Sequence, residues 1–251
     1  MQKIWVCGAR GQIGQAVNDV VDKLEFEMLD TDVDDLDVTD TDEVLRFGEM
    51  NRPDIIINCS GMTDISSCEE NPSQAFKVNA LGARNLAIVA AKMQAKMVQL
   101  STDDVFDGKS TEPYTEFDIT NPGTVYGKSK LAGENYVKEF TTKHFIVRST
   151  WVYGKGQNFI NGFLKKVDAG EQLSIASDQF GSPTSANELA RFLLHLVHTS
   201  EYGTYHATNK GVCSRYAFAQ EILKMTGKTA SMQPVPTVGF FQGETGVCGT
   251  R

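Results

Sequence analysis

The chain has 251 residues and a formal net charge of −8, from 32 Asp and Glu against 24 Lys and Arg. Apolar residues make up 41% and charged residues 22%, which excludes collagen, coiled coil and wholesale disorder and is typical of a soluble globular protein. The acidic balance argues against general nucleic-acid binding, which needs a basic surface. An anionic small ligand is compatible with it, because backbone N–H groups can hold phosphates without net positive charge.

The sequence predicts a cytoplasmic protein. Arg10 and two glycines interrupt the apolar run 4–7 too soon for a secretory signal, and no stretch approaches the apolar length of a membrane span. Five cysteines, an odd number without a C-x-x-C pair, indicate reduced thiols. We therefore expect neither a membrane nor a nucleic acid among the partners.

Short apolar runs alternate with longer helical patterns up to about residue 150. Thr39 to Asp42 resembles a capping box, with Thr39 at the helix N-cap. Alternation at this spacing implies right-handed βαβ units and a parallel sheet with helices on both faces. We therefore predict an α/β fold, with a doubly wound Rossmann domain for NAD(P) over residues 1–150. Its strands are expected at 4–7, 26–29, 55–57, 97–100 and 145–147, and its helices at 12–24, 40–51, 72–93 and 126–140.

The regular alternation of strand and helix patterns ends in the second part of the chain, residues 151–251. There the patterns predict a smaller mixed α/β lobe that is mainly substrate-binding. Strands from this part can rejoin the main sheet, so we expect the two parts to interleave. The expected helices are 159–167, 186–199 and 216–225, and the expected strands are 173–175 and 205–207.

Three glycines separate the first predicted strand from the first predicted helix. The dinucleotide fingerprint is G-x-G-x-x-G, and here its first gap is one residue longer. Glycines permit the tight turn, the approach of the backbone to a pyrophosphate and the packing of helix on strand, while the helix N-terminus favours phosphate charge. This position favours a cofactor site over a plain turn. The predicted cofactor residues here are Gly8, Arg10, Gly11, Gln12, Ile13 and Gly14.

Two charged residues point to opposite cofactor preferences. Asp30, at the end of the second predicted strand, is placed to accept hydrogen bonds from an adenosine ribose and to oppose a 2′-phosphate. Arg10, in the glycine turn, could instead pair with a 2′-phosphate. The choice between NADH and NADPH is therefore open. A solvated loop is the alternative for Asp30, because an aspartate-rich stretch follows it.

Tyr126 and Lys130 are four residues apart on a predicted helix, so their side chains point the same way. A free phenol has a pKa of about 10. A lysine ammonium within a few ångströms favours the phenolate, and we expect it to lower the pKa of Tyr126. The tyrosine could then protonate a carbonyl oxygen as a hydride reaches the carbon. An exposed helix face is the alternative.

A second group of polar residues follows the predicted strand 97–100. Thr102 is expected at the carboxyl edge of the sheet, where ligands bind in open α/β folds, and could hydrogen-bond the same carbonyl oxygen. Gly61 follows the preceding strand and would let a cofactor approach closely. No metal site is predicted, because His195 and His198 lack a nearby cysteine or carboxylate motif.

Together these motifs resemble the extended short-chain dehydrogenase/reductase family, and more closely its dTDP-4-dehydrorhamnose reductases. The resemblance covers about residues 1–236. Its most specific segments are 101–108 (STDDVFDG), 125–134 (VYGKSKLAGE) and 148–154 (RSTWVYG).

The resemblance implies that NADPH or NADH reduces C4 of dTDP-4-dehydro-β-L-rhamnose to give dTDP-L-rhamnose, for surface polysaccharide synthesis. It implies that Tyr126 donates the proton, that Lys130 tunes it and holds the nicotinamide ribose, and that Thr102 polarises the carbonyl. It allows a homodimer, with a Mg²⁺ ion at the subunit interface. The remaining implied contacts are Asp37 and Val38 with the adenine, Gly61, Met62 and Thr63 with the cofactor, and Thr102, Asp103 and Trp151 with the dTDP-sugar.

The chain departs from the family pattern at two places. The family usually has Tyr where Asp104 stands, on the substrate side of the site. The family also continues for several tens of residues, whereas this chain ends in the Gly-rich stretch 240–251. We expect that stretch to be poorly ordered.

Two other functions are compatible with the fold. One is a non-catalytic, NADP-binding regulatory subunit of the kind that partners methionine adenosyltransferase; intact Tyr126, Lys130 and Thr102 argue against it, while Asp104 and the short C-terminus argue mildly for it. The other is an extended reductase or epimerase that acts on a different nucleotide sugar.

Overall fold

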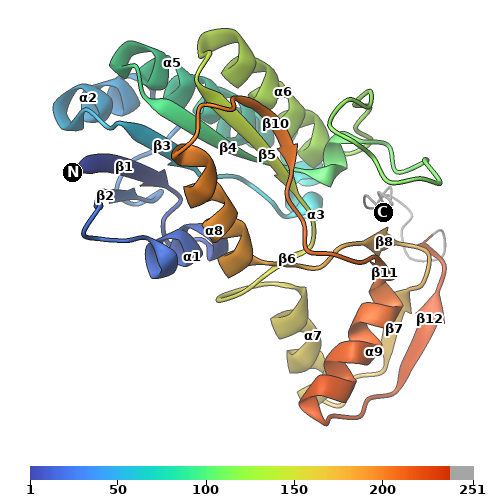
Figure 1. The fold of residues 1–251 in the computed structure, drawn as a ribbon. Helices are drawn as coiled ribbons and strands as arrows, with labels where there is room; N and C mark the ends of the chain where they lie inside the picture. Colours follow the sequence, from blue (N-terminus) through green and yellow to red (C-terminus); the bar gives the residue numbers. More distant parts are fainter. Residues whose placement is uncertain (238–251) are drawn as a thin grey trace.

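The structure, a computed structural model, describes residues 1–237, so the expectation of a poorly ordered stretch 240–251 lies outside the described residues. Its centre is a six-stranded, all-parallel sheet in the order β10-β5-β4-β3-β1-β2 (Figure 1). The sequence β1, β2, β3 runs first to one side of β1 and then to the other, which places a topological switch point between β1 and β3. The strands are β1 (Gln2–Cys7), β2 (Phe26–Thr31), β3 (Ile55–Asn58), β4 (Lys96–Thr102), β5 (His144–Ser149) and β10 (Gly203–His206).

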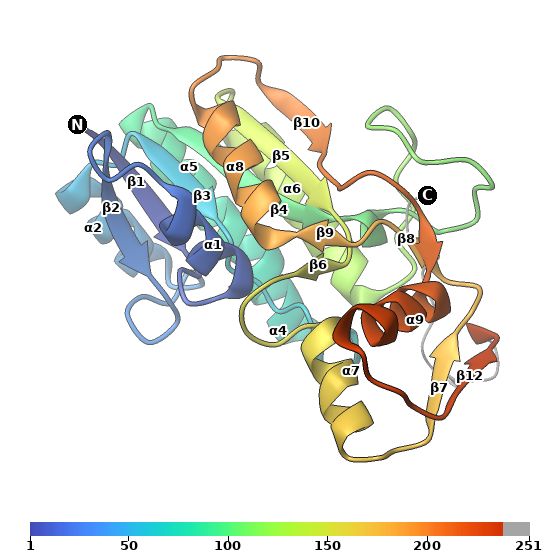
Figure 2. The same cartoon turned by 60° about the horizontal axis from the view of Figure 1, so that its bottom comes forward.

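Helices cover both faces of the sheet (Figures 1 and 2). Helices α1 (Gln12–Val20) and α8 (Ala186–Val197) pack together on one face, with buried Ile4, Val6 and Val98 beneath them. The opposite face is covered by three helices over the alternate strand residues, among them buried Trp5 and Ile56. Strands buried on both faces explain why the predicted runs are apolar without alternation. The three helices are α2 (Thr41–Asn51), α5 (Ala83–Met93) and α6 (Val125–Phe140).

The smaller lobe lies apart from the sheet in Figure 1. It consists of α7 (Phe159–Asp168), β7 (Leu173–Ala176), α9 (Arg215–Thr226) and β12 (Met232–Val235), which share one small apolar core. Between its two halves, α8 and β10 return to the main sheet. We propose that the substrate lobe is the pair of segments on either side of this return. Four short strands complete the connections: β6 (Val152–Tyr153) pairs with β9 (Thr184–Ser185), and β8 (Phe180–Gly181) with β11 (Cys213–Ser214).

Three details of the expected helices differ from the structure. The N-cap of α2 is Asp40, not Thr39, because the Asp40 carboxylate accepts the Glu43 N–H at 2.9 Å. The first helix ends at Val20, four residues early, because the chain becomes extended at Val21 before β2. A short helix, α3 (Ile65–Glu70), was not predicted.

The expected helix 72–93 contains a π-helical turn that the sequence did not predict. It runs as α4 (Pro72–Phe76), a π-helix (Lys77–Gly82) and then α5. Buried Asn79 lies in the π-helix, and its side-chain amide hydrogen-bonds the backbone N–H and C=O of Met62 at 2.8 and 2.9 Å. Such turns often occur at functional sites. Here it positions the loop that follows β3.

No helix within residues 1–237 combines the length and apolar character that crossing a membrane requires.

If α8 belongs to the core of the sheet, Leu193→Ala should destabilise the sheet itself. Leu193 is fully buried between α8 and the sheet, so truncation should lower the free energy of unfolding by about 2–5 kcal/mol. Urea denaturation followed by circular dichroism measures the loss. Leu24→Ala is the matched control, because Leu24 is 92% exposed and its truncation should change stability by no more than about 0.5 kcal/mol. Equal effects of the two changes would contradict this assignment of α8.

Candidate active site

Two adjoining cavities open where the strands of the sheet end. The larger, of about 630 Å³, lies between the ends of β1, β3, β4 and β5 and the small lobe. The smaller, of about 410 Å³, lies between the ends of β1, β2 and β3. Gly11, Cys59, Ser60 and Gly61 line both, so the two cavities form one continuous hollow across the switch point. This is where open α/β sheets bind their ligands.

The glycine turn lies where the two cavities adjoin, with Gly8 lining the smaller cavity and Gly11 lining both. Gly8 has φ +74°, and a Cβ there would lie 2.8 Å from the Ser60 amide nitrogen, so no other residue fits without displacing the β3 loop. A Cβ on Gly14 would collide with the backbone of Gly8 and Ala9, which shows how closely α1 packs on the turn. Gly11, Gln12 and Ile13 line the larger cavity at the start of α1. The expected turn is therefore present. Gly14 lines neither cavity and instead lets α1 pack against the backbone of the turn.

The expected role of Asp30 is wrong in position. Strand β2 continues to Thr31, so Asp30 still lies within the strand and is exposed outside both cavities. Asp32 occupies the strand end instead, lines the smaller cavity and accepts the Arg10 backbone N–H at 2.8 Å. The Arg10 side chain is exposed, and its guanidinium lies 3.0 Å from Asp34 and 3.5 Å from Asp35. Arg10 therefore borders the cavity without lining it.

The other predicted cofactor residues converge on the hollow. Asp37, Val38 and Met62 line the smaller cavity, Gly61 lines both, and Thr63 lines the larger.

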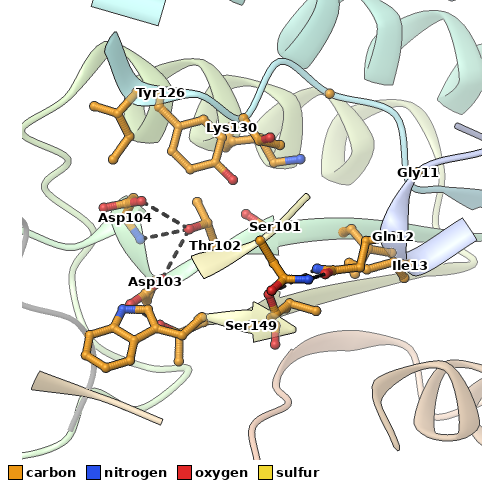
Figure 3. Close-up of a pocket in the computed structure, with 18 of the residues that line it drawn as sticks. Gly11, Gln12, Ile13, Ser101, Thr102, Asp103, Asp104, Tyr126, Lys130 and Ser149 are labelled. Atoms are coloured by element: carbon orange, nitrogen blue, oxygen red, sulfur yellow. Dashed lines mark hydrogen bonds between the residues drawn. The ribbon is translucent and has the colours of Figure 1, made fainter. Parts of the chain in front are cut away.

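Tyr126, Lys130 and Thr102 all line the larger cavity and point toward one another (Figure 3). Helix α6 begins after Thr124, whose hydroxyl accepts the Gly127 N–H at 3.0 Å and sets the first turn. Tyr126 and Lys130 then project one turn apart from the same face. Thr102 reaches them from the last residue of β4. The tertiary structure thus joins residues that the sequence identified separately.

The pKa of Tyr126 is shifted in the direction opposite to the one expected. Burial raises it above its ordinary value, the nearby Asp104 carboxyl raises it further, and a hydrogen bond with Thr102 opposes both effects. Burial also lowers the pKa of Lys130 to about 8, against the attraction of Glu134. The expectation considered only the lysine and omitted both burial and the aspartates. Tyr126 is consequently a neutral phenol at pH 7, which can donate a proton.

A buried ion pair lies beneath the lysine. Glu134, one turn beyond Lys130 on α6, is fully buried and accepts two hydrogen bonds from Arg148, at 2.9 and 2.7 Å. It also accepts the Ser101 hydroxyl at 2.6 Å. These contacts join α6 to the ends of β4 and β5, and thereby fix Tyr126 and Lys130 relative to Thr102.

The substrate side combines predicted and unpredicted residues. Asp103 and Trp151 line the larger cavity as expected. Arg215 was missed: its guanidinium carbon lies 3.5 Å from the centre of a Trp151 ring, and its side chain reaches the cavity from the small lobe. Asn158 was also missed, and its amide donates to the Gln12 side-chain oxygen at 3.0 Å. Neither residue belongs to a local motif, so periodicity and spacing could not identify them.

Within residues 1–237, no group of three or more His, Cys, Asp or Glu side chains could hold a metal ion. The Mg²⁺ ion that the resemblance allows therefore has no support in the described part of a single chain. His195 and His198 both lie at the C-terminal end of α8, where His198 is 3.7 Å from Glu25.

The parallel sheet, the glycine turn and the Tyr126–Lys130 pair define an extended short-chain dehydrogenase/reductase. The comparison with protein families narrows this class. Residues 1–243 match the family described as the RmlD substrate binding domain, and the chain belongs to this family.

Similar proteins in other organisms cover most of the chain. A spore coat polysaccharide biosynthesis protein, SpsK, of Bacillus subtilis is 35% identical over 94% of this chain and 84% of its own. A crystal structure of a dTDP-4-dehydrorhamnose reductase from Clostridium acetobutylicum is 42% identical, with a TM-score of 0.94 over 96% of this chain and 86% of that one. A dTDP-4-dehydrorhamnose reductase from Bacillus anthracis, solved in complex with NADP, is 38% identical, with a TM-score of 0.93 over 96% of this chain and 87% of that one.

The buried ion pair generates a stability prediction. Arg148→Met should lower the free energy of unfolding by about 3–5 kcal/mol, because the buried Glu134 carboxylate loses its two guanidinium hydrogen bonds, which the partly exposed Lys138 ammonium at 3.7 Å does not replace. Arg191→Met is the matched control: it removes an exposed contact with Glu188 at 2.9 Å, which should contribute only about 0–1 kcal/mol. Urea denaturation of both variants measures the difference. Similar losses of unfolding free energy in the two variants would contradict the proposal that the buried Glu134–Arg148 pair stabilises the fold.

Proposed function

We propose that this protein catalyses the NADPH-dependent reduction of the C4 ketone of dTDP-4-dehydro-β-L-rhamnose to dTDP-L-rhamnose, a step in dTDP-rhamnose and surface polysaccharide biosynthesis. One observation carries the proposal: Thr102, Tyr126 and Lys130 converge in a cavity continuous with the glycine turn. The chain belongs to the RmlD family, and its relatives include dTDP-4-dehydrorhamnose reductases. These relatives support a dTDP-sugar as the substrate.

The residues around the hollow fit a dinucleotide. Gly8 and Gly14 let the β3 loop and α1 pack closely on the glycine turn, and Gly11 and Gly61 line both cavities without side chains. The backbone N–H groups of Gly11, Gln12 and Ile13 would hold the pyrophosphate at the N-terminus of α1. When bound, NADPH supplies the hydride that reduces the ketone.

We place Asp32, in place of Asp30, at the edge of the adenosine site, where it holds the Arg10 backbone N–H, and we place Asp37 and Val38 near the adenine. Gly61, Met62 and Thr63 would flank the cofactor. Lys130 would hold the nicotinamide ribose; its pKa of about 8 keeps most of its charge at pH 7.

The protein's own side chains donate a proton to the ketone oxygen and polarise the carbonyl group. Neutral Tyr126 donates its hydroxyl proton to the ketone oxygen, and the Thr102 hydroxyl hydrogen-bonds the same oxygen. Lys130 stabilises the tyrosinate that results, because its positive charge lies on the same helix face.

The sugar nucleotide would lie between the two lobes. Asp103 and Trp151 face it, and the guanidinium of Arg215 supplies a cation from the small lobe that suits its diphosphate. A cytoplasmic location is part of the proposal, supported by the free thiols of Cys7 and Cys213. The homodimer stays a prediction.

Tyr126→Phe tests the function directly. The change removes the proton donor and little volume, so substrate-dependent NADPH oxidation should fall by about 10²- to 10⁴-fold. Absorbance of the nicotinamide follows the reaction, with dTDP-4-dehydrorhamnose generated in place from dTDP-glucose. NADPH binding, measured by fluorescence titration, should stay within about threefold of the wild type, which separates lost chemistry from lost folding.

Full turnover by Tyr126→Phe would overturn the proposed mechanism. Cofactor binding by the wild type without any oxidation, together with stoichiometric binding to a partner enzyme, would instead favour the regulatory function. A different C4 configuration in the product, or no net consumption of cofactor, would indicate a reductase or epimerase for another nucleotide sugar.

Arg10→Ala tests the choice of cofactor. We propose that Arg10 leaves its aspartate partners to pair with the 2′-phosphate of NADPH, a contact that NADH lacks. The variant should bind NADPH about tenfold more weakly, equivalent to about 1.4 kcal/mol, and NADH with unchanged affinity. Fluorescence titrations with both cofactors measure the ratio. Equal losses for both would remove Arg10 from the recognition of the phosphate.

A further inference from the structure

Asp104 is an acidic side chain inside the catalytic cavity that the proposed reduction does not use. It lines the larger cavity next to Thr102, on the side of Thr102 away from Lys130 (Figure 3). The Asp104 backbone N–H donates to Thr102 Oγ1 at 3.2 Å, and the Asp104 Oδ2 atom lies 3.4 Å from the same oxygen. The second distance is long for a hydroxyl hydrogen bond, as catalytic contacts often are before the substrate binds.

The backbone holds Asp104 against the tyrosine. A 3₁₀-helix (Asp103–Val105) follows β4, with Thr102 as its N-cap. Gly127 comes directly after Tyr126 on α6, and a Cβ there would collide with the Asp104 carbonyl oxygen. Because Gly127 lacks that atom, α6 approaches the 3₁₀-helix closely. Tyr126, Thr102 and Asp104 therefore form one contiguous group.

Two adjacent carboxyl groups share this place, and their partners differ. Asp103 Oδ2 accepts the Thr150 hydroxyl at 2.6 Å, and Asp103 Oδ1 lies 3.2 Å from Thr102 Oγ1. Each carboxylate oxygen of Asp103 therefore has a threonine hydroxyl within hydrogen-bond distance. Burial and the neighbouring Asp103 raise the pKa of Asp104 well above its usual range. When two carboxyl groups lie this close, one keeps its proton, and we assign that proton to Asp104, whose oxygen has the longer contact with Thr102 Oγ1.

The charges around Asp104 come from three parts of the fold. Asp103 is on its own 3₁₀-helix, Tyr126 faces it from α6, and Arg215 faces it from α9. Arg215 lowers the pKa of Asp104 but does not outweigh burial and Asp103. Lys130, also on α6, lies on the far side of Thr102.

We propose that Asp104 restores the proton of Tyr126 after each reduction, through the hydroxyl of Thr102. This inference rests on the proposed function. In the reduction, the Tyr126 O–H bond breaks and its proton forms the new hydroxyl of the sugar, which leaves a tyrosinate. The Asp104 O–H bond then breaks, its proton goes to Thr102 Oγ1, and the hydroxyl proton of Thr102 goes to the tyrosinate. Asp104, which lines the larger cavity, finally takes a proton from water in that cavity.

The test is Asp104→Asn, which keeps the size of the side chain and removes its acidic proton. In rapid mixing with NADPH and substrate, the first turnover should proceed at the wild-type rate with about one NADPH oxidised per site. Later turnovers at pH 7 should be about tenfold slower or more, because Tyr126 recovers its proton slowly. Asp42→Asn is the matched control and should behave as the wild type, because Asp42 is exposed on α2 and lines neither cavity.

Four further readouts separate a proton supply from a structural role. The steady-state rate of the wild type should fall as pH rises, first because Asp104 loses its proton and then because Lys130, with a pKa of about 8, loses its charge. Asp104→Asn should keep only the fall that is due to Lys130. A small acid such as imidazolium should restore turnover to Asp104→Asn, and Asp104→Glu should retain most of it. The infrared carbonyl band of a protonated carboxylic acid should be present in the wild-type protein alone at pH 6 and absent in Asp104→Asn.

Equal steady-state rates and pH profiles in wild type and Asp104→Asn would overturn the inference. So would a slowed first turnover that small acids do not rescue, which would indicate a packing role. A wild-type protein that does not oxidise NADPH with the substrate would overturn the proposed function instead. The infrared band then still decides whether Asp104 holds a proton, because that measurement needs no substrate.

Discussion

The buried contact between Glu134 and Arg148 is the interaction on which the site depends. Glu134 is fully buried, and its carboxylate is satisfied by the Arg148 guanidinium and the Ser101 hydroxyl. A charge in that position is tolerated only with such partners. Because the three residues come from α6, β5 and β4, satisfying one charge also fixes the helix that carries Tyr126 and Lys130 against the strand that carries Thr102. The arrangement of the three proposed catalytic residues is thus a consequence of the need to satisfy one buried charge.

Burial then sets the protonation states in the cavity. Tyr126 is neutral because a phenolate there would lose its hydration and face the Asp103 and Asp104 carboxyls. Burial also lowers the pKa of Lys130, because it disfavours the charged ammonium. A reductase that delivers a proton benefits from this balance, since its donor holds the proton until the reacting oxygen becomes more basic. In our proposal, burial acts on Asp104 in the same way, so that this carboxyl group holds a proton that can pass through Thr102 to Tyr126.

Much of the site could be predicted because its signals are local. The order of strands and helices follows from apolar runs and their spacing, and the glycine turn and the Tyr126–Lys130 spacing each lie within one short segment. Asp30 shows where local reasoning fails. The strand continues two residues further than its apolar run, so Asp32 reaches the cavity instead. The π-helical turn is likewise not visible in a local pattern: its buried Asn79 contacts Met62, seventeen residues away in sequence.

The sequence alone predicted the doubly wound fold, the position of the glycine turn, and the three residues Thr102, Tyr126 and Lys130 that the structure brings together in one cavity. These depend on periodicity, glycine conformation and helical spacing, all of which act over a few residues. Only the tertiary structure decided that α8 and β10 complete the main sheet, that Arg215 from the small lobe faces the aspartates, and that the pKa of Tyr126 moves upward. Each of these depends on groups distant in sequence, since burial and electrostatic interaction are set by which surfaces pack together.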